Sequence, residues 1–253
     1  MELTKELAEI LGMFAADGNM QDGYVCMWGS IHEDQEYYNK VVCPLFSMVL
    51  NKKVAAHEKP SNSVYGFYIC DKNVVEKFKE FGFTKKKTYN VKAPKIILNS
   101  GDKEIIASFI RGFTDCDGCL NFFKRYDKGY TEFRKKYHSY PRILIQIASE
   151  KMIDDLGYLL GKLGINYSRH IKKSNKANEQ DLYVLTIRGN NGLKQWIDRI
   201  GFNNPSKYFK YLIWKKYGFC PTPLKYSQEI SILSETSSPY DYYNGSNFET
   251  QNF

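Results

Sequence analysis

The feature that most constrains the fold of this chain is an internal duplication. The stretches EILGMFAADGNM at 9–20 and SFIRGFTDCDGCL at 108–120 share the spacing Gly-x4-Asp-Gly at an offset of 100 residues. Each stretch continues an apolar segment with helical spacing, so we predict helices over 3–17 and 103–116. Two copies of one unit in a single chain predict two similar halves that pack against each other.

The segments that follow each stretch also correspond. An apolar pattern with helical spacing runs through 32–50 and again through 149–165. Two short strands around a polar turn come next in each copy, and then an amphipathic helix that ends at Gly-Phe, at Phe83 and at Phe202. Each unit therefore predicts the order helix–strand–strand–helix–strand–strand–helix.

These correspondences divide the chain into four segments. Residues 1–83 form the first repeat, 84–102 a basic linker, 103–225 the second repeat with a C-terminal basic helix, and 226–253 a tail. The tail is rich in Ser, Asn and Tyr, so we expect it to be disordered, with its tyrosines available for docking.

The second repeat is longer than the first. From Gly18 to Phe83 the chain advances 65 residues and from Gly118 to Phe202 it advances 84, a difference of 19. The extra residues fit best within 124–142, a basic and aromatic stretch. We expect this stretch either to extend a nucleic-acid footprint or to form a surface hairpin.

The charge of the chain favours a polyanionic partner. The formal net charge is +8, and because the last 28 residues carry four acidic and no basic side chains, residues 1–225 hold +12. No apolar run approaches the ~20 residues of a membrane span. The start of the chain is acidic and amphipathic, unlike a secretory signal. We therefore expect a cytoplasmic protein that makes no membrane contact.

The cysteines offer an alternative chemistry. Cys116 and Cys119 have the Cys-x2-Cys spacing of a redox pair or of half a zinc site. The four histidines show no spacing that would complete such a site, and the stretch 9–20 of the first copy has no cysteine. We therefore expect reduced thiols, and we assign the chemistry to the aspartates that both copies share.

Two aspartates at equivalent helix ends form a candidate metal site. A carboxylate in the last turn of a helix lies at the negative end of the helix dipole, and a second carboxylate adds repulsion. If a pseudo-twofold axis relates the halves, the small residues let the two helices approach, and Asp17 and Asp117 emerge at the same end. Mg²⁺ would offset both costs and also binds phosphate oxygens.

The glycines after these aspartates have a predicted structural role. Gly18 and Gly118 are expected to stop the two helices in the left-handed conformation. The alternative interpretation of the motif is that Asp17 and Asp117 only cap turns, but two equivalent copies behind glycine-containing helices favour a site.

The motifs ILGMFAADG (10–18) and IRGFTDCDG (110–118) resemble the two signature motifs of the LAGLIDADG homing endonucleases. The resemblance spans residues 3–220 and is to the single-chain, intron-encoded members. It implies an α+β fold, a pseudo-twofold duplicated αββαββα arrangement whose two antiparallel sheets form a DNA-binding saddle. It also implies a monomeric endonuclease that uses Mg²⁺ to cut both strands of a long, asymmetric DNA target and so promotes intron homing; Mn²⁺ or Ca²⁺ would substitute in binding.

The resemblance assigns roles to individual positions. Asp17 and Asp117 become the catalytic, metal-binding carboxylates, and the backbone carbonyls of Ala16 and Cys116 become further metal ligands. Asp115 falls at an earlier acidic position of the motif and is expected at a helix end or interface. The family often adds a Gln or Lys near the bound phosphates, and the candidates for that position, each more simply explained without a catalytic role, are Ser30, His32, Lys124 and Ser149.

Strand alternation predicts which residues face DNA. In RILIQIAS (142–149) isoleucines alternate with Arg and Gln, which places the polar side chains on one face. Aligning AAHEK with SRHIK places His57 and His170, and the lysines two residues later, on matching faces. For each residue the alternative is a solvated strand face. The predicted DNA contacts, all of types that suit base edges or phosphates, are Gln21, His57, Lys59, Arg125, Arg142, Gln146, His170 and Lys172.

The remaining basic clusters carry no sequence-specific prediction. The lysines within 85–87 and 207–216 are expected to contact phosphates or solvent.

Two alternative functions stay open. One is an RNA-binding maturase that assists intron splicing, and the other is a non-catalytic DNA-binding protein; the presence of both Asp17 and Asp117 argues against the second. The ends of the chain do not match the splice junctions of an intein, which disfavours that class.

Overall fold

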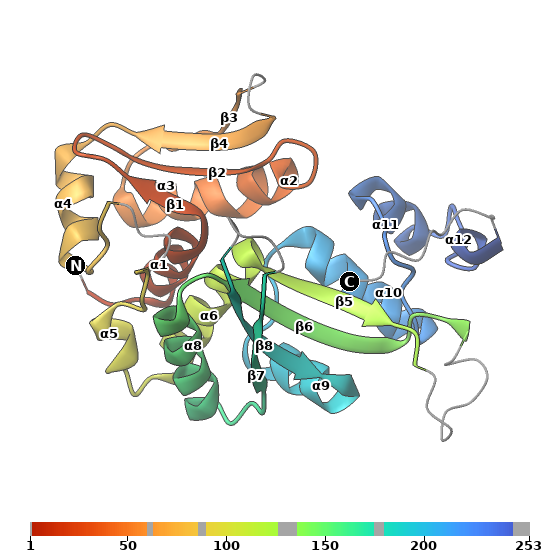
Figure 1. The fold of residues 1–253 in the computed structure, drawn as a ribbon. Coiled ribbons are helices and arrows are strands. Elements are labelled where there is room, and N and C mark those ends of the chain that lie inside the picture. Colours follow the sequence, from red (N-terminus) through yellow and green to blue (C-terminus); the bar gives the residue numbers. More distant parts are fainter. Residues whose placement is uncertain (1, 60–62, 86–89, 126–135, 175–179, 245–253) are drawn as a thin grey trace.

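The computed structural model describes residues 2–59, 63–85, 90–125, 136–174 and 180–244. Within these ranges the chain forms two four-stranded antiparallel sheets with helices packed against them, which confirms the predicted α+β class and the duplicated element order. The sheets lie next to a central pair of helices, one from each half (Figure 1).

The first half begins with the motif helix and ends with the helix before Gly82. Its elements are α1 (Lys5–Asp17), β1 (Gly18–Met20), β2 (Val25–Ser30), α2 (Gln35–Tyr37), the π-helical turn η1 (Tyr38–Val42), α3 (Cys43–Leu50), β3 (His57–Lys59), β4 (Val64–Ile69) and α4 (Lys72–Glu80). The linker contributes the short helix α5 (Lys95–Leu98).

The second half repeats this order and then continues. Its elements are α6 (Lys103–Asp117), β5 (Gly118–Phe123), β6 (Tyr140–Ile147), α8 (Glu150–Lys162), β7 (Ser168–Lys172), β8 (Leu182–Arg188) and α9 (Gly189–Arg199), followed by α10 (Pro205–Tyr217), α11 (Tyr226–Leu233) and α12 (Asp241–Asn244). Residues 126–135 of the predicted insertion lie outside the described residues.

The two sheets have the same topology and the same register. The strand orders are β1-β2-β4-β3 and β5-β6-β8-β7. Gly18 pairs with Met27 in the first sheet, and Gly118 pairs with Ile145 in the second. Both partners are buried against helices, so alternate residues of each strand face away from the helices. This helix-free side of each sheet is called its outer face below.

Glycines set the approach of the two motif helices. A Cβ atom added at Gly12 would lie 2.1 Å from the carbonyl oxygen of Phe109, and one added at Gly112 would lie 2.2 Å from the carbonyl oxygen of Glu9. The contacts are equivalent in the two directions, because 9 and 109, like 12 and 112, are related by the offset of 100. Backbone therefore packs directly on backbone where α1 and α6 cross, as the small residues predicted.

The glycines that follow the motif helices differ from the prediction. Gly18 (φ −67°, ψ 145°) and Gly118 (φ −96°, ψ 164°) are extended, so neither ends its helix in the left-handed conformation. A Cβ at Gly18 would lie 2.2 Å from the ring of Phe14, and one at Gly118 would lie 2.4 Å from Cγ2 of Thr114. Glycine is needed there because a strand starts without a connecting turn and presses the chain against the preceding helical turn.

A single core of buried apolar side chains runs through both halves. Its largest members include Phe14, Phe46, Phe67, Phe109, Phe113 and Trp196. The linker adds to this core and docks on the second half: the Ser149 hydroxyl donates to the Val91 carbonyl (2.6 Å), and the Ala93 N–H donates to the Asp155 carboxylate (3.0 Å). Among the described residues, no helix is long and apolar enough to cross a bilayer.

The prediction of a disordered tail is wrong for residues 226–244, which form α11, packed on α10, and α12 beyond it (Figure 1). Tyr226 stacks on Phe209 with ring centroids 5.6 Å apart. The Tyr243 hydroxyl lies 2.7 Å from Nδ1 of His138. Docking by tail tyrosines thus supplies the apolar burial that a compositional argument assumes to be missing. Residues 245–253 lie outside the described residues.

Candidate active site and nucleic-acid interface

The two motif aspartates are the last residues of the crossing helices. Asp17 ends α1 and is half-buried, whereas Asp117 ends α6 and is exposed. Burial raises the pKa of the Cys116 thiol well above its usual range, and the negative charges of Asp17 and then Asp117 raise it further. Both carboxylates therefore lie near one thiol at the same end of the helix pair, as the pseudo-twofold arrangement predicted.

Two buried tyrosines stand on the first-half side of this end. Tyr37 and Tyr38 are 2% and 1% exposed, and neither hydroxyl has a hydrogen-bond partner among the described residues. Burial raises the pKa of both hydroxyls, and the negative charge of Asp17 adds to that shift. The tyrosines are therefore neutral, and both are close enough to Asp17 for its charge to act on them.

Asp115 has a structural role, as the sequence predicted. It is 1% exposed, and Oδ2 of its carboxylate accepts from the backbone N–H groups of Asn203 (2.7 Å) and Asn204 (3.0 Å), just before α10. Burial raises the pKa of this carboxyl to about 6, although the charge of Lys207 and the two N–H groups oppose the shift. Asp115 therefore ties the end of α6 to the start of α10.

Lys207 is the clearest residue that sequence reasoning misplaced. The sequence predicts contact with phosphate or solvent, but Lys207 is 9% exposed, and its ammonium donates to the carbonyls of Thr114 (2.8 Å) and Asp115 (2.5 Å). These carbonyls belong to the last turn of α6, so the positive charge lies at the negative end of the helix dipole, one turn from Asp117. Its neighbours Lys210 and Lys215 resemble it in sequence, so no signal singled it out.

The four candidates for an accessory catalytic residue differ in burial and in their surroundings. Ser149 is buried and caps α8, so its role is structural. Lys124 is exposed at the end of β5, with its ammonium 5.9 Å from the ring centroid of Tyr243. Ser30 ends β2, and its hydroxyl accepts from the His32 N–H (3.3 Å). His32 is the one of the four that lines the same cavity as Cys116, described next.

A cavity of about 1190 Å³ opens beside the end of α6. The turn after β2 supplies His32 and Asp34, α10 supplies Lys207 and Lys210, and residues 223–228, which include the start of the tail, supply a wall. Burial raises the pKa of the Asp34 carboxyl, although its hydrogen bond from the Ser30 N–H (2.7 Å) and then the charge of Lys207 oppose the shift. The cavity thus joins parts of both halves and the tail next to the candidate carboxylates.

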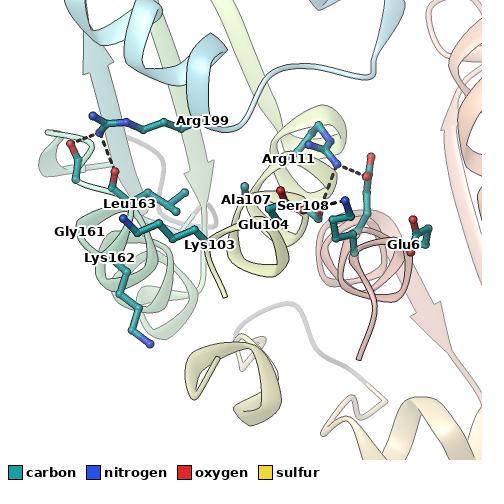
Figure 2. A pocket seen from close by; sticks show the side chains of 13 residues that line it. Glu6, Lys103, Glu104, Ala107, Ser108, Arg111, Gly161, Lys162, Leu163 and Arg199 are labelled. Carbon is teal, nitrogen blue, oxygen red and sulfur yellow. Dashed lines mark hydrogen bonds and ion pairs between the residues drawn. The ribbon is translucent and has the colours of Figure 1, made fainter. Parts of the chain in front are cut away.

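A second cavity, of about 840 Å³, lies at the opposite end of the helix pair, where α1 and α6 begin (Figure 2). Its two arginines are engaged with protein groups: Arg111 donates to the Glu9 carboxylate (2.5 Å) and the Ile200 carbonyl (2.9 Å), and Arg199 donates to the carbonyls of Leu163 and Gly164. These contacts join the two halves and brace the second half internally, so we place the site at the aspartate end instead.

The donors at the aspartate end suit a hard divalent cation. Carboxylate and carbonyl oxygens from Asp17, Asp117, Ala16 and Cys116 are the ligand types that Mg²⁺, Mn²⁺ and Ca²⁺ accept. In the part of the chain that the structure describes, no three His, Cys, Asp or Glu side chains gather to hold a metal ion. A site with two protein carboxylates suits Mg²⁺, which usually binds few protein ligands and completes its coordination shell with water and substrate phosphates.

The outer face of β6 carries Arg142 and Gln146, as alternation predicted, together with Tyr140 and Leu144. Ile143 and Ile145 are each 1% exposed on the helix side. Arg142 lies on the outer face, with its guanidinium 4.4 Å from the ring centroid of Phe123. Gln146 pairs with Val184, which pairs with His170, so these three form one row across the face.

The outer face of the first sheet carries the equivalent row. Trp28 pairs with Gly66, which pairs with His57. His57 and His170 therefore occupy matching positions, as do Lys59 and Lys172 two residues later, which confirms the alignment of these two strands. That any of them contacts DNA stays a prediction.

The other predicted contacts lie at the edges of the sheets. Gln21 is exposed in the tight turn between β1 and β2, where its side chain donates to Asn19 (3.3 Å). Arg125 follows β5, and its guanidinium lies 4.5 Å from the ring centroid of Tyr140. Lys85 is paired with Asp22 and does not simply face solvent, while Lys86 and Lys87 lie outside the described residues.

Comparison with protein families and solved structures agrees with this architecture. A family model of a LAGLIDADG-like domain matches residues 104–201. A structure of variants of the homing endonuclease I-DmoI superposes with a TM-score of 0.53 at 14% identity, covering 79% of this chain and 92% of that one. The homing endonuclease I-WcaI bound to its DNA recognition sequence superposes with a TM-score of 0.50 at 11% identity, covering 82% of this chain and 88% of that one.

The curated relatives each match this chain over one segment of their own length, and their names describe different proteins. The replication factor C small subunit of Methanocaldococcus jannaschii is 26% identical over 83% of this chain and 10% of its own length. An A-type ATP synthase subunit from Pyrococcus abyssi is 29% identical over 79% of this chain and 17% of its own length. This chain thus spans a small part of either relative, and the shared segment sits inside proteins with unrelated names.

Proposed function

We propose that this chain is a site-specific DNA endonuclease that hydrolyses both strands of a long, asymmetric target. It matches the model of a LAGLIDADG-like domain and has the fold of the LAGLIDADG homing endonucleases. The observation that carries the proposal is the convergence of Asp17 and Asp117 at one end of two helices that cross backbone to backbone. Two equivalent carboxylates beside a pseudo-twofold axis suit two antiparallel strands, because each strand would meet one of them.

The chain's own residues would position the reacting groups. Asp17 and Asp117, with the carbonyls of Ala16 and Cys116, would hold divalent metal ions against the two scissile phosphates. Mg²⁺ bound there would lower the pKa of water and stabilise charge on the leaving oxygen. Lys207 would hold the α6 end in place through Thr114 and Asp115.

The outer faces of the two sheets would bind the duplex on either side of this centre. Arg142, Gln146, His170 and Lys172 on one sheet, and His57 and Lys59 on the other, are of the types that contact base edges and phosphates. The net charge of +12 over residues 1–225 supports binding to a polyanion. I-DmoI has been crystallised in complex with DNA and Mn, and a variant of it with its target DNA in the presence of Mg, which supports a divalent cation as the cofactor here.

The test is cleavage of a randomised duplex library. The protein is incubated with the library and Mg²⁺, and the cut ends are sequenced; a single recurring long site is expected, with no cutting in EDTA. Asp17→Asn and Asp117→Asn should each lower double-strand cleavage by roughly 100-fold or more, as loss of a group that stabilises transition-state charge does. Binding to the selected site should persist in both variants.

The other outcomes discriminate between the functions. Specific binding with no cutting in any divalent metal would overturn the endonuclease and favour a non-catalytic DNA-binding protein. Binding to structured intron RNA with no DNA site would favour the maturase. Equal cutting by wild-type protein and by both aspartate variants would place the chemistry elsewhere in the molecule.

A further inference from the structure

Three side chains form an aromatic cluster on the outer face of the first sheet. The ring centroids of Trp28 and His57 are 5.3 Å apart, those of His57 and Tyr68 are 5.4 Å apart, and both pairs meet edge to face. The ammonium of Lys59 lies 5.4 Å from the centroid of Trp28. The face that would meet DNA is therefore mainly aromatic in the first half.

The equivalent positions of the second half have a different chemistry. The registers place Gln146 where the first half has Trp28, and Thr186 where it has Tyr68. Tyr68 is 57% exposed, whereas Thr186 is 2% exposed. A carboxamide that donates and accepts hydrogen bonds thus replaces an indole that only donates, and the projecting phenol has no projecting counterpart.

Part of the aromatic cluster has a structural explanation. Gly66 has no side chain, and it lies between Trp28 and His57 in the sheet. A Cβ at Gly66 would lie 2.1 Å from the carbonyl oxygen of Met27, so glycine is needed and the flanking rings cover it. This need does not extend to Tyr68, whose side chain projects from the face.

The two chemistries select different features of the major groove. Apolar and aromatic atoms make favourable contact with the 5-methyl group of thymine, whereas Gln pairs with adenine and Arg with guanine through paired hydrogen bonds. Lys59, beside Trp28, provides the positive charge that a phosphate backbone requires. The occupant of this face is thus duplex DNA presenting methyl groups.

We infer that the first half recognises thymine methyl groups through Trp28 and Tyr68, while the second half recognises hydrogen-bonding base edges through Arg142 and Gln146. The inference rests on the proposed function, because it specifies the DNA that the same enzyme would select. The target should therefore be asymmetric in chemistry: its first-half side needs thymine methyls, and its second-half side does not.

Deoxyuridine tests the inference without altering the protein. Replacing thymine by deoxyuridine removes one methyl group and leaves every hydrogen-bonding group in place. In the site selected from the library, each thymine is replaced in turn, and cleavage and binding are measured for the wild-type protein. One lost methyl contact should weaken binding roughly fourfold, from the transfer free energy of a single buried carbon.

The orientation of the protein on its site can be fixed through a natural thiol. Cys70 directly follows β4 in the first half and is exposed, whereas the other five cysteines are buried or half-buried. Burial raises the pKa of Cys116 and Cys119 and slows their alkylation. An iron–EDTA reagent attached at Cys70 would cut the DNA nearest the first sheet and so identify that half-site.

The expected result is that deoxyuridine weakens binding in the half-site next to Cys70 and has no effect in the other half. Trp28→Gln, which installs the residue of the second half, should abolish the sensitivity at the thymine that Trp28 contacts and leave the sensitivity at a thymine that Tyr68 contacts; Gln146→Ala, as the matched control, should leave both. Specific cleavage with equal or no sensitivity in both halves would overturn the inference and leave the endonuclease standing. Failure to bind any specific DNA would overturn both.

Discussion

The C-terminal ends of α1 and α6 occupy equivalent places in the two halves but are held differently. The end of α6 is fixed from outside the repeat, because Lys207 and the amides before α10 bind Thr114 and Asp115. At the end of α1, Ala15 stands in the place of Asp115, so no equivalent carboxylate binds backbone N–H groups there, and the charge of Asp17 acts on the buried Tyr37 and Tyr38. A duplicated backbone can thus present two equivalent aspartates while each half supports its own in a separate way.

The largest loss of stability should come from adding a methyl group where α1 and α6 cross, which also tests whether the two helices cross symmetrically. Gly12→Ala and Gly112→Ala should each destabilise the protein by about 3 kcal/mol or more, because the added Cβ meets a carbonyl oxygen of the facing backbone. Denaturant unfolding measures the loss. If the crossing is truly twofold, the two variants should lose similar amounts.

Gly161→Ala is the matched control for both variants. Gly161 lies near the end of α8, and a Cβ there would meet no atom of the described residues within 4 Å. Its replacement should leave stability unchanged or raise it by up to about 1 kcal/mol, since alanine favours the helix. Comparable losses in all three variants would mean that the crossing does not limit the approach of the helices.

The next largest effect should be confined to the second half. Asp115→Ala removes the acceptor of two backbone N–H groups before α10, and it should cost about 3 kcal/mol in the free energy of unfolding. Asp115→Asn, which keeps one acceptor oxygen, should cost less. If the alanine variant is as stable as the wild type, then the bracing of the α6 end by α10 is not the real difference between the halves.

The third prediction concerns the tail, which only the second half carries. Glu229 on α11 is 0% exposed; its carboxylate accepts from the Ser206 hydroxyl (3.0 Å), and Lys210 lies 3.8 Å away. Burial raises the pKa of this carboxyl to about 7, against the charge of Lys210 and the Ser206 hydrogen bond, while the charge of Glu33 adds to the shift.

The sign of the pH effect follows from that raised pKa. Between the ordinary value of 4.5 and about 7, the unfolded chain has lost the proton that the folded protein keeps. The stabilising contribution is therefore complete below pH 4.5 and falls away by about 3 kcal/mol as the pH rises through 7. Thermal unfolding from pH 4.5 to 8 should show this decline in the wild type relative to Glu229→Gln, and parallel curves would contradict it.

The smallest effect should come from the far end of the tail. Tyr243→Phe removes a hydroxyl that lies 2.7 Å from Nδ1 of His138 and accepts from the His138 N–H (3.2 Å). The loss should be about 1 kcal/mol, as for one partly buried hydrogen bond. Tyr24→Phe, at an exposed position of the first half, provides the comparison and should be neutral. A neutral Tyr243→Phe would show that this hydroxyl adds no stability to the second half.

Much of the fold followed from pattern alone, because the pattern occurs twice. The spacing of Gly12 and Asp17, repeated at Gly112 and Asp117, predicted the crossing and the shared end of the two helices. Alternation along β6 predicted which of its residues face outward. These features depend on the strand period of two residues, on the helix period of 3.6 residues and on close backbone approach. Each of these requires particular residue types at fixed spacing, so it can be recognised within a short stretch of sequence.

The features that escaped prediction depend on contacts between distant segments. Lys207 is one lysine in a basic helix, and its burial becomes evident only once α10 lies across the end of α6. The order of the tail depends on Tyr226 meeting Phe209 and on Glu229 meeting Ser206, which a composition rich in Ser, Asn and Tyr does not reveal. The extended glycine after α6 depends on the strand that follows without a turn.

The backbone-to-backbone crossing of the halves has a consequence for exchanging them between proteins. Because glycine carries no side chain, the contact at Gly12 and Gly112 offers little to mismatch in a chimera built from two different family members. The polar contacts across the junction require specific side chains, because Glu9 accepts hydrogen bonds from both Arg111 (2.5 Å) and Asn203 (2.5 Å) of the other half. A foreign first half grafted at this junction should therefore keep a carboxylate at position 9, or it will leave a largely buried guanidinium without its counter-charge.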